Sequence, residues 1–313
     1  MSCHLFISPH LDDVVLSCGG TIANLTLHHE RVVIVTTMAG EPPVGLPSTP
    51  LLEAVRARWQ SGRNLLAVRR MEDAHAAHIL GAQIIHLPIY ESIFRMAPGA
   101  GGVRVPLYPN EASVYGDMQQ GDDAHITLLE MACPCEDAAI IYAPLCADTH
   151  IDHRIARDWA LKLTHSGKLI PLRFYEEFPA ASVGASGSSR PNVRYALQGY
   201  RMNFPPYLLS LVVNVLPPEA VQAKFDAMRC YQSHVGVLWQ DIAAMEQQTR
   251  TFMNVSASPT TTSSGGTGPL RGTGTLRGTG TLGASGGGSP NYSVVPPPPP
   301  PTYAERFWNV TME

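Results

Sequence analysis

Short apolar runs rich in β-branched residues alternate with longer amphipathic patterns over roughly the first 180 residues. Apolar runs bounded by turn residues predict buried strands, whereas apolar residues that recur every three or four positions predict helices. The predicted strands are Cys3–Ser8, Val32–Thr37, Gln83–Leu87 and Ala138–Ala143, and the predicted helices are Val14–His29 and Leu51–Leu80. Because helix follows strand repeatedly, we expect an α/β fold: a three-layer αβα sandwich with a mostly parallel, Rossmann-like sheet.

The globular pattern continues to about residue 255. Leu208–Val215 predicts another strand, and Pro217-Pro218 predicts the start of a helix over Glu219–Tyr231, since proline is tolerated in a first helical turn. We therefore expect residues 1–255 to form one domain.

From residue 256 the sequence is dominated by Ser, Thr, Gly and Pro, and the segment Leu270–Thr275 repeats at once as Leu276–Thr281. Such a tract cannot bury enough apolar surface to fold, so we expect 256–301 to be a low-complexity insertion that ends in a polyproline spacer. Aromatic residues then return, and we expect 302–313 to dock back on the domain.

Composition and charge narrow the class of partner. The formal charge is -4, and without a block of Lys or Arg a nucleic-acid partner is not expected, which favours a small-molecule substrate. Residues 1–8 lack the basic region of a signal peptide and no long apolar stretch is present, so we expect a cytoplasmic protein without membrane contact. The six cysteines suit a reducing compartment, with Cys133 and Cys135 as ordinary thiols.

Polar residues suited to catalysis follow the first predicted strand, in Ser8-Pro9-His10-Leu11-Asp12-Asp13. In open parallel sheets, ligands bind at the carboxyl ends of the strands. An imidazole and two carboxylates at this place can supply metal ligands and a proton acceptor. Adjacent carboxylates repel each other when both are ionised, which favours a nearby cation.

A second polar cluster follows the fourth predicted strand, in Asp148-Thr149-His150-Ile151-Asp152-His153. If 150–153 form a first helical turn, His150 and His153 lie on one face and reach one site. Together the clusters offer two imidazoles and a carboxylate, with a fourth position left to water. That is the open arrangement of a catalytic zinc site.

Two other interpretations fit parts of this pattern. Asp12 and Asp148 could cap helices, with the histidines bonded to backbone carbonyls. Paired acidic residues after a first strand also occur in receiver domains, but those need an aspartate after strand three, where this chain has His86-Leu87-Pro88, and a later lysine. Two clusters at two strand ends of one sheet favour the metal site.

The paired motifs Pro9-His10-Leu11-Asp12-Asp13 and His150-Ile151-Asp152-His153 resemble those of the LmbE-like, or PIG-L, family of N-acetylglucosaminyl deacetylases. The resemblance extends over nearly all of residues 1–240. It includes Arg69–Asp73, Leu80–Ala82, Lys224 and Tyr231–His234. It implies a hydrolase that removes an N-acetyl group from an amino sugar or glycoconjugate.

The resemblance implies a role for each matching residue. His10, Asp13 and His153 would hold Zn²⁺, and a site with these ligand types also accepts Fe²⁺, Co²⁺ or Mn²⁺. Asp12 would be the general base that takes a proton from the attacking water. His150 would face the scissile amide and, if protonated, would stabilise the developing oxyanion and help to protonate the leaving amine.

The chain departs from the common family motif at Leu11, where relatives carry proline, and at Val14, where they carry an acidic residue. Neither change removes a ligand. Relatives often have an aspartate that binds sugar hydroxyls where this chain reads Leu87–Glu91, and we expect Glu91 to take that role.

Several further residues are expected near the substrate. Asp152 would orient an imidazole from beyond the metal ligands. Arg70, with Arg69 nearly equal to it, would hold a substrate hydroxyl or phosphate, although an arginine on a long helix is commonly solvated or ion-paired. The Gly-, Pro- and Tyr-rich segment 90–120 would be a substrate lid or a plain surface loop, and Glu176 or Glu177 could line the pocket.

The sequence thus predicts metal-dependent hydrolysis of an N-acetylated sugar. Two alternatives are an amidase for another acyl group, on an antibiotic or lipid intermediate, and a sugar-binding module without turnover. Asp12 argues against the second, because a module that only binds needs no base. The substrate, the acyl length, the metal, a homo-oligomeric state and the role of 256–301 stay open.

Overall fold

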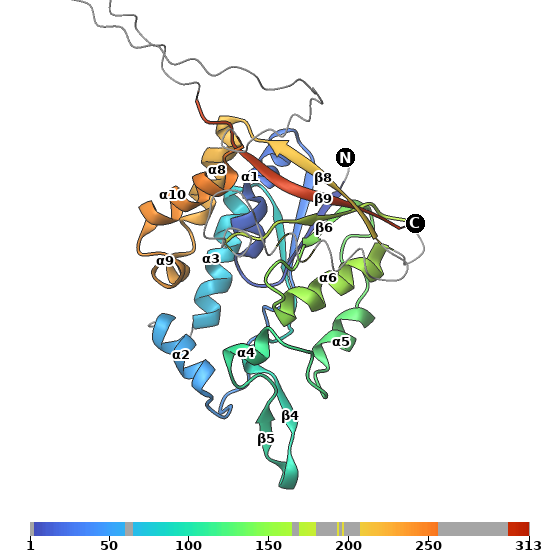
Figure 1. Ribbon diagram of the computed structural model, residues 1–313, viewed down its shortest axis with the longest axis vertical. Coiled ribbons are helices and arrows are strands. Elements are labelled where there is room, and N and C mark those ends of the chain that lie inside the picture. Colours follow the sequence, from blue (N-terminus) through green and yellow to red (C-terminus); the bar gives the residue numbers. More distant parts are fainter. Residues whose placement is uncertain are drawn as a thin grey trace, which may run out of the picture.

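The chain forms a seven-stranded sheet between layers of helices, in a computed structural model that describes residues 3–59, 65–164, 169–179, 193, 196, 207–255 and 300–312 (Figure 1). The strand order is β3-β2-β1-β6-β7-β9-β8. The parallel strands are β1 Cys3–Ser8, β2 Arg31–Thr36, β3 Gln83–His86, β6 Ala138–Pro144 and β7 Leu172–Tyr175. β8 Tyr207–Val215 and β9 Ala304–Met312 add antiparallel pairs at one edge. The predicted α/β class and mostly parallel sheet are confirmed.

Helices cover both faces of the sheet (Figure 1). α1 Asp13–Leu27, α3 Leu65–Ile79 and α8 Pro218–Met228 pack together on one side, and α5 Ala124–Glu130 and α6 Ile151–Thr164 pack on the other. Because both faces are covered, the central strands are apolar throughout, and every residue of β2 after Arg31 is buried.

The order of the strands places the two polar clusters side by side. The chain builds β2 and β3 on one side of β1 and then returns to build β6 and β7 on the other. β1 and β6 are therefore hydrogen-bonded neighbours, with Phe6 opposite Tyr142. Loops that leave such neighbouring strands in opposite directions open a crevice at the carboxyl edge of the sheet, where ligands bind in folds of this kind.

The predicted lid segment is a folded arm. It contains the short helix η1 Ser92–Phe94, an antiparallel hairpin of β4 Met96–Pro98 and β5 Arg104–Pro106 around η2 Ala100–Gly102, and α4 Glu111–Val114. Figure 1 shows the hairpin projecting away from the sheet. A buried contact anchors its base, where the Tyr108 hydroxyl donates to Asp122 at 2.7 Å.

The C-terminal strand is tied to the centre of α1 by a buried ion pair. Nζ of Lys224 on α8 lies 2.6 Å from Glu305 on β9, and both side chains are almost fully buried. The Glu305 carboxylate also accepts the N–H groups of Gly20 at 3.0 Å and Thr21 at 2.7 Å. A Cβ at Gly20 would lie 3.1 Å from Oε1 of Glu305 and 2.4 Å from a methyl group of Leu216, so a larger residue at this position would displace the Leu216 side chain.

Some predicted elements differ from those observed. The predicted helix 51–80 is divided between α2 Pro50–Trp59 and α3, with 60–64 outside the described residues, and the helix predicted to reach Tyr231 ends at Met228. The chain continues through α9 Gln232–Leu238 and α10 Ile242–Met253. Almost all of the predicted insertion 256–301 lies outside the described part of the chain.

The structure also corrects the expectation for one cysteine. Cys135 forms a disulfide with Cys3 and is not an ordinary thiol, because the parallel pairing of β1 with β6 brings the start of β1 beside the segment that precedes β6. Cys18, Cys133, Cys146 and Cys230 are free thiols. Among the helices that the structure describes, none has the length and apolarity needed to cross a membrane.

Candidate active site

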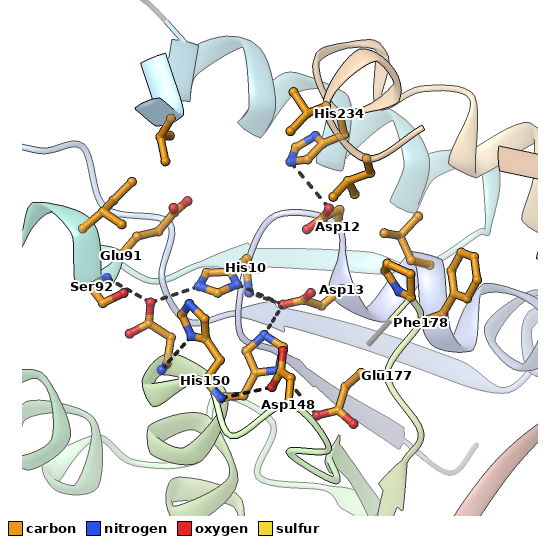
Figure 2. A pocket seen from close by; sticks show the side chains of 18 of the residues that line it. His10, Asp12, Asp13, Glu91, Ser92, Asp148, His150, Glu177, Phe178 and His234 are labelled. Atoms are coloured by element: carbon orange, nitrogen blue, oxygen red, sulfur yellow. Dashed lines mark hydrogen bonds and ion pairs between the residues drawn. The ribbon is translucent and has the colours of Figure 1, made fainter. Parts of the chain in front are cut away.

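A pocket of about 710 Å³ opens at the carboxyl ends of β1 and β6 (Figure 2). It is lined by the residues that follow β1, including His10, Asp12 and Asp13, and by residues 147–150, Asp152 and His153. Side chains 142 positions apart are in direct contact there, because Nε2 of His10 lies 3.0 Å from Asp152. The fold therefore brings the two predicted clusters together.

Three candidate metal ligands converge in this pocket. Oδ2 of Asp13 lies 3.3 Å from Nδ1 of His10 and 3.4 Å from Nε2 of His153. Each of the three residues offers a ligand atom, and these atoms lie within 4.8 Å of one another. The backbone N–H of His10 donates to the same Asp13 oxygen at 2.8 Å and fixes the carboxylate. Two imidazole nitrogens and one carboxylate oxygen are the donor set of open zinc sites, so the residues fit such a metal.

A second carboxylate lies next to each of these histidines, at the ring nitrogen that points away from Asp13. Nε2 of His10 faces Asp152, and Nδ1 of His153 lies 3.4 Å from Glu177. A carboxylate accepts from an N–H, so both protons are assigned to these outer nitrogens. In the neutral imidazoles the lone pairs are then left on the nitrogens that face Asp13, which is the tautomer a metal ligand needs.

Asp152 is fully buried and joins His10 to the base of the arm. It accepts the backbone N–H of Ser92 at 2.9 Å and is ion-paired with the Arg95 guanidinium. Burial alone would raise the pKa of this carboxyl, but Arg95 and His10 hold it below its usual range. Asp152 is therefore a charged acceptor for His10.

Asp12 lies beside the three candidate ligands and is almost completely buried. Its Oδ2 lies 3.5 Å from Nε2 of His234, a residue of α9 (Figure 2). Burial and the neighbouring Asp13 raise the pKa of Asp12 well above its ordinary value. A carboxylate held out of water with a raised pKa is a suitable proton acceptor.

His150 lines the pocket as a neutral imidazole. Burial, together with the nearby His10 and His153, lowers its pKa to about 3, so the protonated form considered from the sequence is not the one present near neutral pH. Its Nδ1 accepts the backbone N–H of Asp152 at 3.1 Å. The proton is therefore assigned to Nε2, and His150 can still donate a hydrogen bond into the pocket.

The loop between β6 and α6 owes its shape to two residues in the left-handed region. Cys146 has φ 61° and Thr149 has φ 65°, which is costly for residues other than glycine. Contacts on both sides retain these conformations: Glu177 accepts the N–H of Cys146, and the Thr149 hydroxyl donates to the carbonyl of Tyr115 on the arm at 3.3 Å. Strain held in this way is common at functional sites.

Arg69, not Arg70, reaches the pocket. Arg69 is buried, pairs with Glu91 at 2.5 Å and lies over the Trp59 ring at 4.2 Å. Arg70 is not among the pocket-lining residues of the described chain, because successive residues on a helix point about 100° apart. The structure thus places the predicted Glu91 in the pocket and replaces Arg70 with its neighbour.

The helix-cap interpretation holds for neither aspartate. Asp148 accepts the N–H of His150, which precedes α6, at 3.0 Å, and the N–H of Asp152 in the first turn is accepted by Nδ1 of His150. The Asp12 side chain makes no capping hydrogen bond, and the Ser8 hydroxyl accepts the N–H of Val14 at 3.1 Å instead. The candidate ligands contact carboxylates and not only backbone carbonyls. The polar residues that follow β1 are therefore arranged as a binding site and not as a helix cap.

Sequence reasoning missed the contacts of three residues of this pocket. Glu177 was expected only to line the pocket, and its contact with His153 could not be foreseen. His234 occurs in a motif of the family resemblance, yet nothing local placed it beside Asp12. Trp59 carried no signal, because an aromatic residue on a helix is usually part of a core.

The fold and site define an α/β protein in which candidate metal ligands lie beside a buried carboxylate. A family model described as "PIG-L: GlcNAc-PI de-N-acetylase" matches residues 5–164, just over half of the chain, and the chain belongs to this family. The 2'-N-acetylparomamine deacetylase of Niallia circulans is 28% identical over 189 residues, which make up 56% of this chain and 66% of that protein, just under two thirds of its length.

Solved structures support the fold. The zinc-inhibited form of teicoplanin deacetylase Orf2 matches with a TM-score of 0.66 and 21% identity, over 100% of this chain and 99% of that one. The A40926 pseudoaglycone deacetylase Dbv21 matches with a TM-score of 0.61 and 22% identity, over 99% of this chain and 97% of that one. At such identities the likeness concerns the fold.

Proposed function

We propose that this protein hydrolyses the N-acetyl amide of an amino sugar or glycoconjugate and releases acetate, with the help of a bound metal ion. One observation carries the proposal: the three converging donor atoms of His10, Asp13 and His153 lie beside the buried carboxylate of Asp12. Family membership and the activity in the name of the Niallia circulans relative support it.

The proposed metal is Zn²⁺, and Fe²⁺, Co²⁺ or Mn²⁺ are alternatives at a site of two imidazoles and a carboxylate. When bound, such an ion polarises the acetyl carbonyl and makes a water acidic enough to lose its proton near pH 7. His10, Asp13 and His153 are the proposed ligands, and Asp152 and Glu177 keep the imidazoles in the required tautomer.

In the proposed reaction, Asp12 takes a proton from the attacking water, whose oxygen forms a bond to the acetyl carbon. The C–N bond then breaks, Asp12 returns its proton to the amine nitrogen, and the acetyl group leaves as acetic acid, which ionises to acetate. The Asp12 carboxylate is ionised most readily when a cation occupies the adjacent ligands, because opposite charge lowers its pKa.

His150 is proposed to donate its Nε2 proton as a hydrogen bond to the oxygen on which negative charge develops. A neutral donor serves this purpose, since a fixed N–H dipole stabilises an oxyanion without full charge. Glu91 and Arg69 are proposed to bind sugar hydroxyls, because this buried ion pair lines the same pocket.

We further propose that residues 1–255 and 302–313 form one catalytic domain, because β9 pairs with both β7 and β8. A cytoplasmic location, a homo-oligomer and the low-complexity character of 256–301 stay predictions from sequence.

The test is metal content by elemental analysis on protein purified without chelator, paired with acetate release from a panel of N-acetylglucosaminides. One metal ion per chain with acetate released is the expected result. Arg70→Ala serves as a matched control beside Arg69→Ala, since only the latter should reduce turnover. Absence of metal both before and after reconstitution would refute the proposal.

A further inference from the structure

His234 carries a buried nitrogen without a hydrogen bond. Its side chain is almost completely buried, and Nε2 has no hydrogen-bond partner among the residues that the structure describes. Nε2 instead faces Oδ2 of Asp12 at 3.5 Å, which is longer than a hydrogen bond (Figure 2). A buried polar atom without a partner costs free energy, so Nε2 of His234 needs an explanation in another state of the site.

The other nitrogen of the His234 ring is held by two residues in series. Both oxygens of Glu72 on α3 accept from Ser233, one from its backbone N–H at 2.9 Å and the other from its hydroxyl at 2.5 Å. Because the hydroxyl has only one proton to give, its oxygen accepts from Nδ1 of His234, which lies 3.1 Å away. Nδ1 of His234 therefore carries a proton.

The His234 ring is neutral and fixed in orientation. Burial, together with the Arg69 guanidinium, holds the pKa of His234 well below its usual range. The rings of Trp59 and Tyr231 lie edge-on to the imidazole, with centroids 5.6 Å and 5.9 Å away. A neutral imidazole that is protonated at Nδ1 has a lone pair at Nε2. Toward Asp12, His234 can therefore accept a hydrogen bond but cannot donate one.

The lone pair of His234 suits only one form of Asp12. An ionised carboxylate also accepts only, so it offers Nε2 nothing, whereas a protonated carboxyl has one O–H to donate. The proposed reaction places a proton on Asp12 between the attack of water and the departure of the amine. When Oδ2 carries this proton, its O–H can turn about the C–O bond toward Nε2, and the two atoms need to approach only from 3.5 Å to about 2.7–3.2 Å.

We propose that His234 is a positioning residue for the general base: its Nε2 accepts a hydrogen bond from Asp12 while Asp12 holds the proton taken from water. Glu72 and Ser233 keep the imidazole in the tautomer that accepts. The proton stays on Asp12 until it passes to the amine nitrogen, so no covalent bond to His234 forms. This inference rests on the proposed function and adds a residue to its machinery.

The test compares His234→Leu with His234→Gln on the metal-loaded full chain. Leucine removes the acceptor, whereas Oε1 of glutamine can take the position of Nε2. His234→Leu should lower kcat by about 10–100-fold with KM and metal content unchanged, because the protonated Asp12 loses a buried hydrogen bond. His234→Gln should retain most of the wild-type kcat. His78→Leu is the control, because His78 is an exposed residue of α3 that does not line the pocket.

Three results would overturn the inference. Equal losses of kcat in the leucine and glutamine variants would show that His234 only fills space. An unchanged kcat in His234→Leu would show that Asp12 needs no acceptor. A loss confined to KM would make His234 a contact for the substrate and not for the base.

Nitrogen NMR on protein labelled with ¹⁵N-histidine tests the tautomer without turnover. Near neutral pH, His234 should be protonated at Nδ1 and unprotonated at Nε2, and Ser233→Ala should mix the two tautomers. A proton on Nε2 in a wild type that releases acetate would refute the role of His234 alone. A wild type with the expected tautomer that releases no acetate would refute the proposed reaction, and the role of His234 would fall with it.

Discussion

Nδ1 of His153 lies 3.4 Å from Oε1 of Glu177, and the same carboxylate accepts the backbone N–H groups of Cys146 and Ala147. Glu177 follows β7, whereas Cys146 and Ala147 follow β6. One buried side chain thus joins the ends of two neighbouring strands to a candidate metal ligand. Burial raises its pKa, and the contact with His153 opposes that shift.

Glu177→Gln should weaken metal binding by about 10–100-fold, because the neutral amide no longer stabilises the Nδ1 proton of His153. The measurement is a competition titration with a metal chelator. Glu176→Gln is the matched control, since Glu176 accepts from the Trp308 indole at 3.2 Å and lies away from the ligands. Equal affinities for the two variants would contradict the orienting role.

Asp12→Ala should retain the metal and lose kcat by several orders of magnitude, since general base catalysis contributes about 10²–10⁴-fold and the raised pKa of Asp12 suits that role. His153→Ala should lose the metal itself. Metal analysis and acetate release on both variants separate the two roles. Normal turnover by Asp12→Ala would mean that another group is the base.

Metal affinity should rise with pH between about 6.5 and 10. Burial disfavours a charged His10, but its hydrogen bonds to Asp13 and Asp152 raise its pKa from 6.5 to about 10 in the metal-free protein. Binding must displace this proton and that of His153, whose pKa is also raised, so the affinity should increase at least about tenfold per pH unit below those pKa values. Metal titrations at pH 7 and pH 9 measure the slope, and a flat profile would contradict it.

The raised pKa of His10 also predicts how the stability of the metal-free protein depends on pH. Because the folded-state pKa of His10 is the higher one, its contribution to stability is fully present below pH 6.5 and is lost as the pH rises through about 10. The thermal midpoint of metal-free protein should fall over this range. The metal-loaded protein should lack that fall, because its His10 is neutral throughout.

Glu305→Ala should lower the free energy of unfolding by about 3–5 kcal/mol, because it leaves the Lys224 ammonium buried without its partner. The double change of Lys224→Met with Glu305→Leu should cost less, since apolar side chains replace the whole pair. Urea unfolding measures both, with the exposed Glu219→Ala on α8 as control. A negligible effect of Glu305→Ala would contradict a structural role for β9.

The sequence by itself determined the class of fold and the two polar clusters. Short apolar runs such as Cys3–Ser8 and Ala138–Ala143 favour buried strands because of their length and flanking turn residues, and residues that follow parallel strands lie at one edge of a sheet. His10, Asp12, Asp13, His150 and His153 could therefore be assigned to one pocket before any contact was known. The local sequence was sufficient for this assignment because the residues around a strand end determine where the strand stops and the loop begins.

The tertiary structure alone decided which side chains hold those residues in place. Glu177 reaches His153 through the parallel pairing of β6 with β7. Asp152 meets Arg95 only because the base of the arm lies against the first turn of α6. The rotation of α3 about its axis decides that Arg69, and not Arg70, faces the pocket. The pairing of Lys224 with Glu305 depends on the position of β9 between β7 and β8. Such contacts join segments far apart in the chain, so no local pattern of residues encodes them.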